Sequence, residues 1–364
     1  MHKWFYIFLM AVFVLACGKD ETPLPGEDLT GIPYDPVLYQ IEIPDDFPAL
    51  EQPEDNMATL DGVILGRKLF YDPILSVDST MSCFSCHLPE LSFTDQKSFS
   101  IGVNGESTQR SSMSLINVGL YYNSLFWDGR SPDLEDQAIH PIEDVIELDN
   151  SWEEVEKRLQ GSDHYPALFR KAFGISSSNE ISRDLATKAI AQFERTLVSS
   201  GNSKYDKVLR GEAVFTDEEQ LGFDIYFDRD PALPDGECFH CHSAPLLTNN
   251  EYMNNGLDAA EEFEDFVDGG RGDITNNRID RGKFRVPTLR NIEFTAPYMH
   301  DGRFETLEEV LDHYNSGGAE SKGKDALLVP LGLDETQLKA LKAFLKTFND
   351  EDFNTNPSYS NPDG

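Results

Sequence analysis

The sequence predicts an all-α protein built from two tandem copies of one helical module. Three observations support this fold class. The 364 residues contain no long run of alternating apolar and polar positions, the pattern that indicates strands. Several stretches instead carry apolar residues at helical spacing. A set of short motifs in residues 65–135 also recurs, in the same order, in residues 221–308.

Helices are expected in four stretches that carry an apolar stripe. They are residues 57–70, 181–197, 221–227 and 335–348. Thr216 and Glu219 form a capping box ahead of the third stretch, because each side chain can accept a hydrogen bond from the other residue's backbone N–H. Most residues of these stripes are expected to be core residues rather than site residues.

The repeat consists of four pairs of motifs. Leu-Gly at 65–66 recurs at 221–222, Leu-x-Asn at 115–117 recurs at 289–291, Asp-Gly-Arg at 128–130 recurs at 301–303, and Leu-Glu at 134–135 recurs at 307–308. The junction falls near residues 199–211, which hold two glycines and little apolar periodicity. The two modules are therefore placed at 53–200 and 201–350, with residues 351–364 as a tail.

Each copy contains the pattern Cys-x-x-Cys-His, at 83–87 and at 238–242. This pattern is the attachment signature of a c-type haem, in which two thiols bond to the porphyrin and the adjoining histidine binds the iron. A zinc or redox-dithiol site needs only Cys-x-x-Cys and leaves the histidine unexplained. The two patterns use four of the five cysteines, so each module is expected to be a cytochrome c-like domain with one covalent haem. The expected attachment residues are Cys83, Cys86, Cys238 and Cys241, and the expected proximal iron ligands are His87 and His242.

The composition excludes some classes of partner. The chain has 65 acidic and 30 basic residues, a net charge of −35, which argues against nucleic-acid binding. If the charge steers association, the partners carry positive patches. The alternative is that acidic stretches such as 261–268 serve only solvation.

The first 17 residues have the pattern of an export signal. Lys3 precedes an apolar run, residues 4–16, that is too short to span a bilayer as a helix. Residues 14–17 read Val-Leu-Ala-Cys and resemble a bacterial lipobox with Cys17 as the lipidated residue; an ordinary signal peptide cut elsewhere is the alternative. Both interpretations place the protein in the periplasm or anchored to the outer membrane by lipid. Residues 18–36 are polar and rich in Pro and Gly, so they are expected to be a tether within an N-terminal extension, 18–52.

The two haems are expected to differ in their second axial position, which decides between electron transfer and chemistry. Tyr314 lies eleven residues after Arg303, beyond an expected helix start at Thr306. The same position after Arg130 is Pro141. A phenol can bind ferric iron and a proline cannot, so the pattern predicts a closed second haem and an open first haem. The alternative is that Pro141 ends a helix and Tyr314 packs in a core.

An open haem that binds peroxide needs an acid–base group to move a proton between the two oxygens. Glu147, six residues past Pro141, is the candidate, although Glu143, Asp144 and Asp149 lie near it in sequence. His140 is the rival, either as the acid–base group or as a hidden iron ligand.

Residues 53–348 resemble the bacterial di-haem cytochrome c peroxidases and the related MauG-like di-haem enzymes. The motifs that carry the resemblance are the paired Cys-x-x-Cys-His patterns, Phe-Trp-Asp-Gly-Arg at 126–130, Val-Pro-Thr-Leu-Arg-Asn at 286–291 and Thr-Ala-Pro-Tyr-Met-His-Asp-Gly at 295–302. The resemblance implies a peroxide site at the N-terminal haem and electron input at the C-terminal haem. It places Trp127 between the haems, and Gln137, Pro141 and Glu147 in the distal pocket.

The resemblance also marks family positions where this chain differs. Tyr314 falls where the peroxidases have an axial Met and the MauG-like enzymes a Tyr, whereas Met299 is in the wrong register for a ligand. Many of the peroxidases close the first haem at rest with a histidine after Ile-Gly, and this chain has Val103 there. A calcium ion is expected between the domains, with carbonyls of Thr295 and Pro297 as ligands, but the usual Asn falls at Ser111 or nearby.

The expected function is a peroxidase that reduces hydrogen peroxide to water at the N-terminal haem, with electrons from a small cytochrome or another redox protein. One alternative is a MauG-like enzyme that oxidises side chains of a partner protein. The other is a di-haem electron carrier with both irons closed. A homodimer is expected only by analogy with the peroxidases.

Overall fold

Helices are the main regular elements of residues 26–364, the part of the chain that the computed structural model describes. The helices are α1 Leu60–Tyr71, α2 Leu134–Gln137, α3 His140–Glu143, α4 Trp152–Gln160, α5 Tyr165–Phe173, α6 Arg183–Glu194, α7 Lys204–Leu209, α8 Asp217–Tyr226, α9 Arg271–Thr275, α10 Leu307–Ser316, α11 Glu335–Leu345 and α12 Glu351–Asn354. Two strands, β1 Tyr252–Met253 and β2 Phe284–Arg285, pair antiparallel. The prediction of a mostly helical chain is confirmed.

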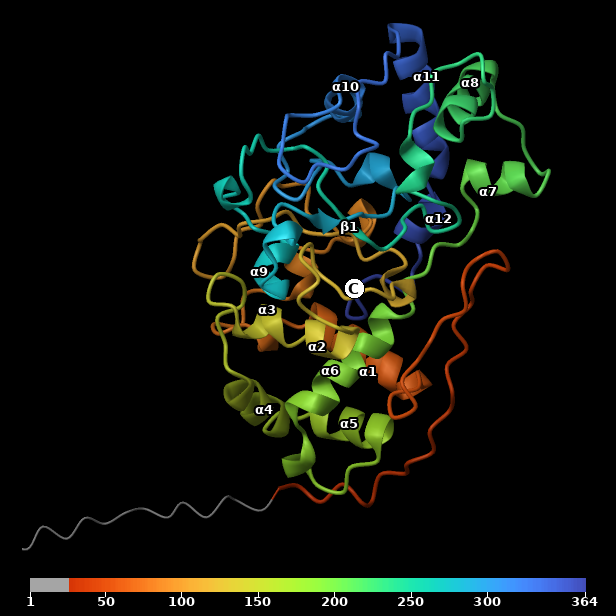
Figure 1. The fold of residues 1–364 in the computed structure, drawn as a ribbon. Helices are drawn as coiled ribbons and strands as arrows, with labels where there is room; N and C mark the ends of the chain where they lie inside the picture. The colour runs from red at the N-terminus through yellow and green to blue at the C-terminus, as the bar shows by residue number, and fades with distance from the viewer. Residues whose placement is uncertain (1–25) are drawn as a thin grey trace, which may run out of the picture.

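The helices gather in two halves of the molecule. Figure 1 shows α1 to α6 in one half and α8, α10 and α11 in the other. Within residues 26–364, no helix combines the length and the apolar character needed to cross a membrane. The predicted signal segment, with Cys17, lies outside the described residues.

All four predicted helical stretches form helices. They correspond to α1, α6, α8 and α11. The capping box also forms, since the Thr216 hydroxyl accepts from the Glu219 N–H and the Glu219 carboxylate accepts from the Thr216 N–H.

A close helix crossing at a glycine occurs in each half. A Cβ atom on Gly66 in α1 would lie 1.8 Å from the Ala189 carbonyl oxygen in α6, and one on Gly222 in α8 would lie 2.1 Å from the Ala340 carbonyl oxygen in α11. Phe193 and Phe344 follow the two alanines by four residues and pack their Cβ atoms on the same glycines. The two helix pairs are therefore equivalent, and the repeat extends to α6 and α11.

The loops between the helices repeat as well. Asn117 and Asn291 both adopt the left-handed backbone conformation, with φ of 61° and 59°. Asn tolerates this region better than most residues. The Asn117 N–H donates to the Leu197 carbonyl and the Asn291 N–H donates to the Phe348 carbonyl, in each case just after the second helix of the crossing pair. The recurring Leu-x-Asn motif therefore joins each loop to the end of its own module.

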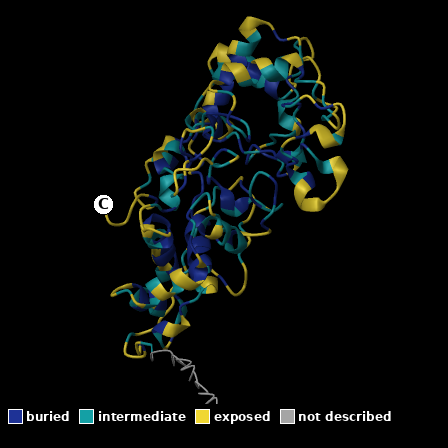
Figure 2. Cartoon of the chain, turned by 90° about the vertical axis from the view of Figure 1, so that its left-hand side faces the viewer, coloured by how far each residue is buried: buried dark blue, intermediate teal, exposed yellow. Residues whose placement is uncertain are grey.

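Each half has its own apolar core. Figure 2 shows buried residues concentrated inside both halves. The first core is built on α1, α4, α5 and α6, with Leu69, Val155 and Phe169 fully buried. The second is built on α8, α10 and α11, with Tyr226 and Phe344 fully buried.

The expected tether and tail are both docked on the folded domains. Leu29 lies inside the expected tether, yet it belongs to the first core, and its backbone N–H donates to the Ser176 carbonyl. At the other end of the chain, Phe353 and Tyr359 pack on Phe93 of the first module. The composition of these segments did not predict that they dock, because isolated apolar side chains, rather than a periodic stripe, hold each segment in place.

The junction between the modules contains α7 and a fully buried ion pair. The Arg290 guanidinium donates two hydrogen bonds of 2.9 Å to the Asp206 carboxylate, and neither side chain is accessible beyond 1%. Removing one partner of such a pair leaves an uncompensated buried charge. The pair therefore ties α7 to the Leu-x-Asn loop of the second module.

We predict that Gly66→Ala and Gly222→Ala each destabilise the fold by about 1–3 kcal/mol, because the new methyl group overlaps a backbone carbonyl across the helix crossing. Urea unfolding of the purified protein measures the effect. Gly31→Ala is the matched control, since nothing lies within 4 Å of a Cβ at Gly31. If all three variants were equally stable, the close helix crossing would not be a constraint that the two halves share.

Candidate functional site

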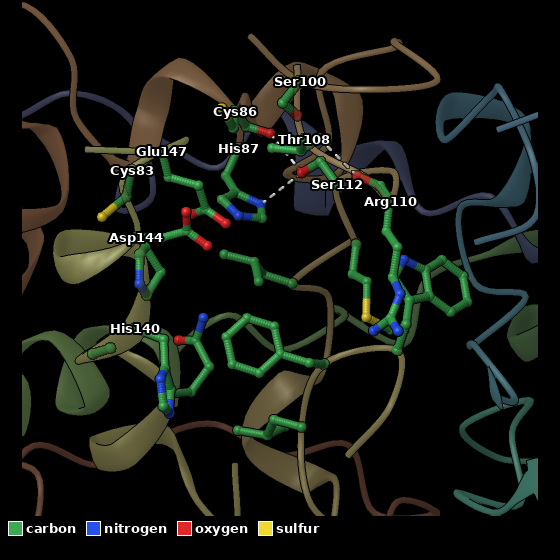
Figure 3. A pocket seen from close by; sticks show the side chains of 18 of the residues that line it. Cys83, Cys86, His87, Ser100, Thr108, Arg110, Ser112, His140, Asp144 and Glu147 are labelled. Atoms are coloured by element: carbon green, nitrogen blue, oxygen red, sulfur yellow. Dashed lines mark hydrogen bonds between the residues drawn. The ribbon is translucent and has the colours of Figure 1, made fainter. Parts of the chain in front are cut away.

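The first Cys-x-x-Cys-His motif opens into a large cavity. Cys83, Cys86 and His87 line a cavity of about 660 Å³, a size typical of cofactor sites. A short 3₁₀ turn, Cys83–Ser85, presents the motif. Figure 3 shows the imidazole of His87 directed into this space, with the carboxylates of Asp144 and Glu147 also pointing inward.

The histidine of each motif is oriented by a backbone carbonyl. Nδ1 of His87 lies 2.7 Å from the Phe93 carbonyl oxygen, and Nδ1 of His242 lies 3.2 Å from the Leu247 carbonyl oxygen. A carbonyl only accepts, so Nδ1 carries the proton and Nε2 is left as a metal-binding lone pair. Burial lowers the pKa of both imidazoles, that of His242 to about 4, so both are neutral and competent to bind iron.

The thiols of the motifs are not arranged as a zinc or dithiol site. Burial raises the pKa of Cys86 to about 11 and that of Cys238 to about 12, so neither is a thiolate at neutral pH. Among residues 26–364, no group of three or more His, Cys, Asp or Glu side chains is placed to hold a metal ion. Thioether attachment of a porphyrin agrees with both observations.

All four predicted catalytic residues line the larger cavity. They are Trp127, Gln137, Pro141 and Glu147. Pro141 is the second residue of α3, just after the gap that separates α2 from α3. It has no N–H to donate to the Gln137 carbonyl, and the equivalent helix of the second module, α10, runs without a break. Pro141 therefore lies in the first turn of a helix, where a proline is tolerated, rather than at the end of one, and it also lines the cavity.

Glu147 is distinguished from its acidic neighbours by its environment. Burial raises the pKa of Glu147 to about 7, with a further rise from the Asp144 charge and an opposing effect from Arg130. The Val103 N–H donates to the Glu147 carbonyl at 2.9 Å. Gly102 fits against the preceding backbone so closely that a Cβ atom would lie 1.5 Å from the Ile146 carbonyl oxygen. The loop that carries a histidine in many peroxidases thus supports the acid–base candidate in this chain.

The rival residue, His140, lies at the rim of the cavity. Its Nε2 atom is 3.2 Å from the Asp136 carboxylate, and its side chain is 41% exposed. The imidazole packs edge-on against Phe126. Among the described residues, His87 and His140 are the histidines that line the larger cavity, so His140 remains the sole histidine there that could close the first haem.

The second motif lines a smaller cavity of about 200 Å³. Tyr314 and Met299 both line it together with His242. The Asn255 amide lies 3.4 Å from the Tyr314 hydroxyl and 3.3 Å from the Met299 sulfur. Burial raises the pKa of Tyr314 to about 12. Both candidate sixth ligands are therefore in the cavity, and Asn255 contacts both.

Trp127 lines both cavities and so lies between them. Its indole N–H donates to the Ser111 carbonyl at 2.9 Å, and its own carbonyl accepts from the Arg285 N–H at 2.8 Å. Arg285 also lines both cavities, with 2% of its surface exposed. The position between the haems that the resemblance implies for Trp127 agrees with this geometry.

Two of the residues named for calcium hydrogen-bond to backbone carbonyls. The Ser111 hydroxyl donates to the Met299 carbonyl, and the Thr295 hydroxyl donates to the Ile292 carbonyl. Calcium binding remains a prediction.

Three residues of the two cavities were missed in the sequence. Asn255 and Arg285 lie outside the recurring motifs that were compared. Glu194, the last residue of α6, lines the larger cavity. It could have been found by extending the repeat to α6 and α11, where Glu194 is matched by Leu345.

Comparison with known proteins agrees with this geometry. Residues 61–214 match the family described as di-haem cytochrome c peroxidase. The chain is 37% identical over 291 residues to cytochrome c551 peroxidase of Nitrosomonas europaea, covering 78% of each protein. The chain belongs to the di-haem cytochrome c peroxidase family. It is also 34% identical over 307 residues to the methylamine utilization protein MauG of Methylorubrum extorquens, covering 83% of this chain and 82% of that protein.

Among solved structures, the chain is similar to a MauG-like protein associated with microbial copper homeostasis. The TM-score is 0.82 at 35% identity, covering 90% of this chain and 100% of that chain. Peroxidases and MauG are oxidoreductases, and this chain is an enzyme of that class. Membership of a di-haem family implies two haem c groups, and each Cys-x-x-Cys-His motif lines a cavity with a neutral imidazole.

We predict that the double variant Cys238→Ser/Cys241→Ser reduces the covalent haem content from two to one per chain, because both thioether bonds at the second motif are lost. Haem-specific absorbance per protein chain, with a haem stain after denaturation, measures it. The matched double variant Cys83→Ser/Cys86→Ser should remove the other covalent haem. Retention of two covalent haems in both variants would contradict the assignment.

Proposed function

We propose that this protein is a di-haem peroxidase that reduces hydrogen peroxide at the larger cavity, with electrons entering through the smaller one. The observation that carries the proposal is the asymmetry of two repeat-related cavities. The larger holds Pro141 and a half-buried carboxyl, Glu147, where the smaller holds Tyr314. One cavity is thus open and has an acid–base group, and the other has a side chain that can close an iron.

The haem iron supplies a binding site for peroxide and, with a reduced redox partner, the two electrons of the reaction. The chain's own residues handle protons and orientation. Glu147 takes the proton from one peroxide oxygen and returns it to the other. Gln137 lines the same cavity and can orient the peroxide by hydrogen bonding, and Pro141 leaves space that a larger side chain would fill. The aromatic ring of Trp127 lies between the two cavities.

We predict that Glu147→Gln lowers kcat by about 10²–10⁴-fold while both haems stay bound. The base form of Glu147 is the carboxylate, so kcat/KM for peroxide should rise as pH increases through about 7 in the wild type. Steady-state turnover with a reduced dye measures both. Glu143→Gln is the control, because Glu143 is a nearby exposed acid. Undiminished turnover in Glu147→Gln would remove Glu147 from the mechanism.

Rapid mixing of the fully ferric protein with peroxide tests whether the first haem is open at rest. A fast change in the main haem absorbance band supports an open site and a peroxide-using enzyme. A change that requires prior reduction indicates a sixth ligand, with His140 as the first candidate. No change in either state, with no binding of cyanide, would identify an electron carrier.

A MauG-like activity is the second candidate, and Tyr314 in the smaller cavity is the observation that favours it. An anionic oxygen ligand stabilises ferric iron and lowers the reduction potential, whereas Met raises it. We predict that Tyr314→Met raises the potential of the second haem and increases turnover with reduced small cytochromes, as measured by redox titration and steady-state kinetics. An unchanged potential would show that Tyr314 is not the ligand.

We also propose that the protein is exported, because c-type haem is attached outside the cytoplasm and residues 1–17 have the pattern of a lipoprotein signal. In this proposal residues 53–200 form the peroxidatic domain and residues 201–350 the electron-transfer domain, both cytochrome c-like. Mass spectrometry of the membrane-bound protein would detect lipid on Cys17. Its recovery in the soluble fraction with an unmodified N-terminus would contradict the anchor.

A further inference from the structure

The larger cavity contains a buried carboxyl that the mechanism above does not use. Glu194 closes α6 with 4% of its surface exposed. It lines the same cavity as Glu147, and its Oε2 atom has no hydrogen-bond partner among the described residues. A carboxyl buried in this way is costly unless something else contacts it.

The repeat shows that packing does not require this carboxyl. The crossing of α1 with α6 at Gly66 is equivalent to the crossing of α8 with α11 at Gly222. This equivalence matches Glu194 with Leu345, and Leu345 lines the smaller cavity from the same place on its helix. A leucine is therefore sufficient for the fold at this position, and the glutamate is specific to the peroxide-binding cavity.

The charged groups around Glu194 leave it free to face the cavity. Arg195, the next residue, points to α2 and pairs with both oxygens of Glu135 at 2.7 Å. Cys83, from the first motif, also lies close enough for the Glu194 charge to raise its pKa. Among the described residues Glu194 thus forms no ion pair, and its charge acts on the first haem-attachment residue.

We propose that Glu194 is a second proton-donating residue of the larger cavity, which supplies one of the two protons consumed when peroxide is reduced. The proposal rests on the peroxidase function proposed above. Reduction of H₂O₂ breaks the O–O bond, takes two electrons from the reduced redox partner and consumes two protons, giving two molecules of water. Glu147 moves a proton within the peroxide. Glu194 adds one of the two incoming protons and is then reprotonated from solvent, and the second incoming proton comes from solvent water.

The protonation state of Glu194 suits this role. Burial raises its pKa to about 8, with Arg195 lowering it and Glu135 raising it. The neutral acid is therefore the main form at pH 7 and is ready to donate. With Glu147 active as the base above about pH 7 and Glu194 active as the acid below about pH 8, the wild-type rate should pass through a maximum between these values.

The test compares Glu194→Gln and Glu194→Leu with the control Asp184→Asn, which removes an exposed acid from the same helix. Both Glu194 variants should bind two haems, since leucine is tolerated at the equivalent position. We expect kcat to fall by about 10²-fold with little change in KM for peroxide, and the decline of activity above about pH 8 to disappear. The control should keep the wild-type profile.

A second measurement without peroxide separates this proposal from the peroxidase function. The potential of the first haem should fall as pH rises in Glu147→Gln, because reduction favours the protonated form of Glu194. In the double variant with Glu194→Gln this dependence should be lost. If the wild type fails to turn over peroxide, the peroxidase function is overturned and this second measurement still decides whether Glu194 holds a proton. Identical pH profiles and potentials in Glu194→Gln and the control would overturn the proposal.

Discussion

The approach of two helices at a glycine is the constraint on which both halves of the molecule depend. Gly66 lets α1 reach the α6 backbone, and Gly222 lets α8 reach the α11 backbone. Each haem motif follows the first helix of its pair, and the second helix of each pair supplies a wall of the adjoining cavity, with Ile190 in one case and Leu341 in the other. The crossing therefore positions the attachment residues and the cavity wall together.

The same scaffold yields two different cavities through a small number of substitutions. Counting from the Asp-Gly-Arg motifs, Gln137 in the larger cavity corresponds to Val310 in the smaller one, and Pro141 corresponds to Tyr314. The polar residue and the residue that leaves space line the larger cavity. The apolar residue and the residue that can bind iron line the smaller one. The different linings of the two cavities can be understood from these pairs, with the backbone held constant.

Much of the fold and of the candidate site could be predicted from the sequence, because the informative signals are local. Cys-x-x-Cys-His is a five-residue pattern, the capping box at Thr216 spans four residues, and α1, α6, α8 and α11 each carry a full apolar stripe. Glu147 was found by its distance from Pro141, although local sequence could not separate it from Asp144, and both side chains line the larger cavity.

The features of the fold and the site that were not predicted depend on contacts between distant parts of the chain. Asn255 reaches Tyr314 across 59 residues, and no spacing rule connects the two. Glu194 ends an amphipathic helix, where a glutamate is ordinarily solvated, and only the crossing at Gly66 shows that it faces a cavity. Leu29 at one end of the chain, and Phe353 with Tyr359 at the other, are isolated apolar contacts that leave no periodic pattern to detect.

The docking of Phe353 and Tyr359 on Phe93 has a consequence for biosynthesis. Because a ribosome makes the chain from its N-terminus, the first module cannot complete its apolar core until residue 359 has been translated. Cys83 and Cys86 therefore emerge long before the core that surrounds them can close. This order leaves the first motif accessible for haem attachment, and it makes the C-terminal segment the last piece of that core to be added.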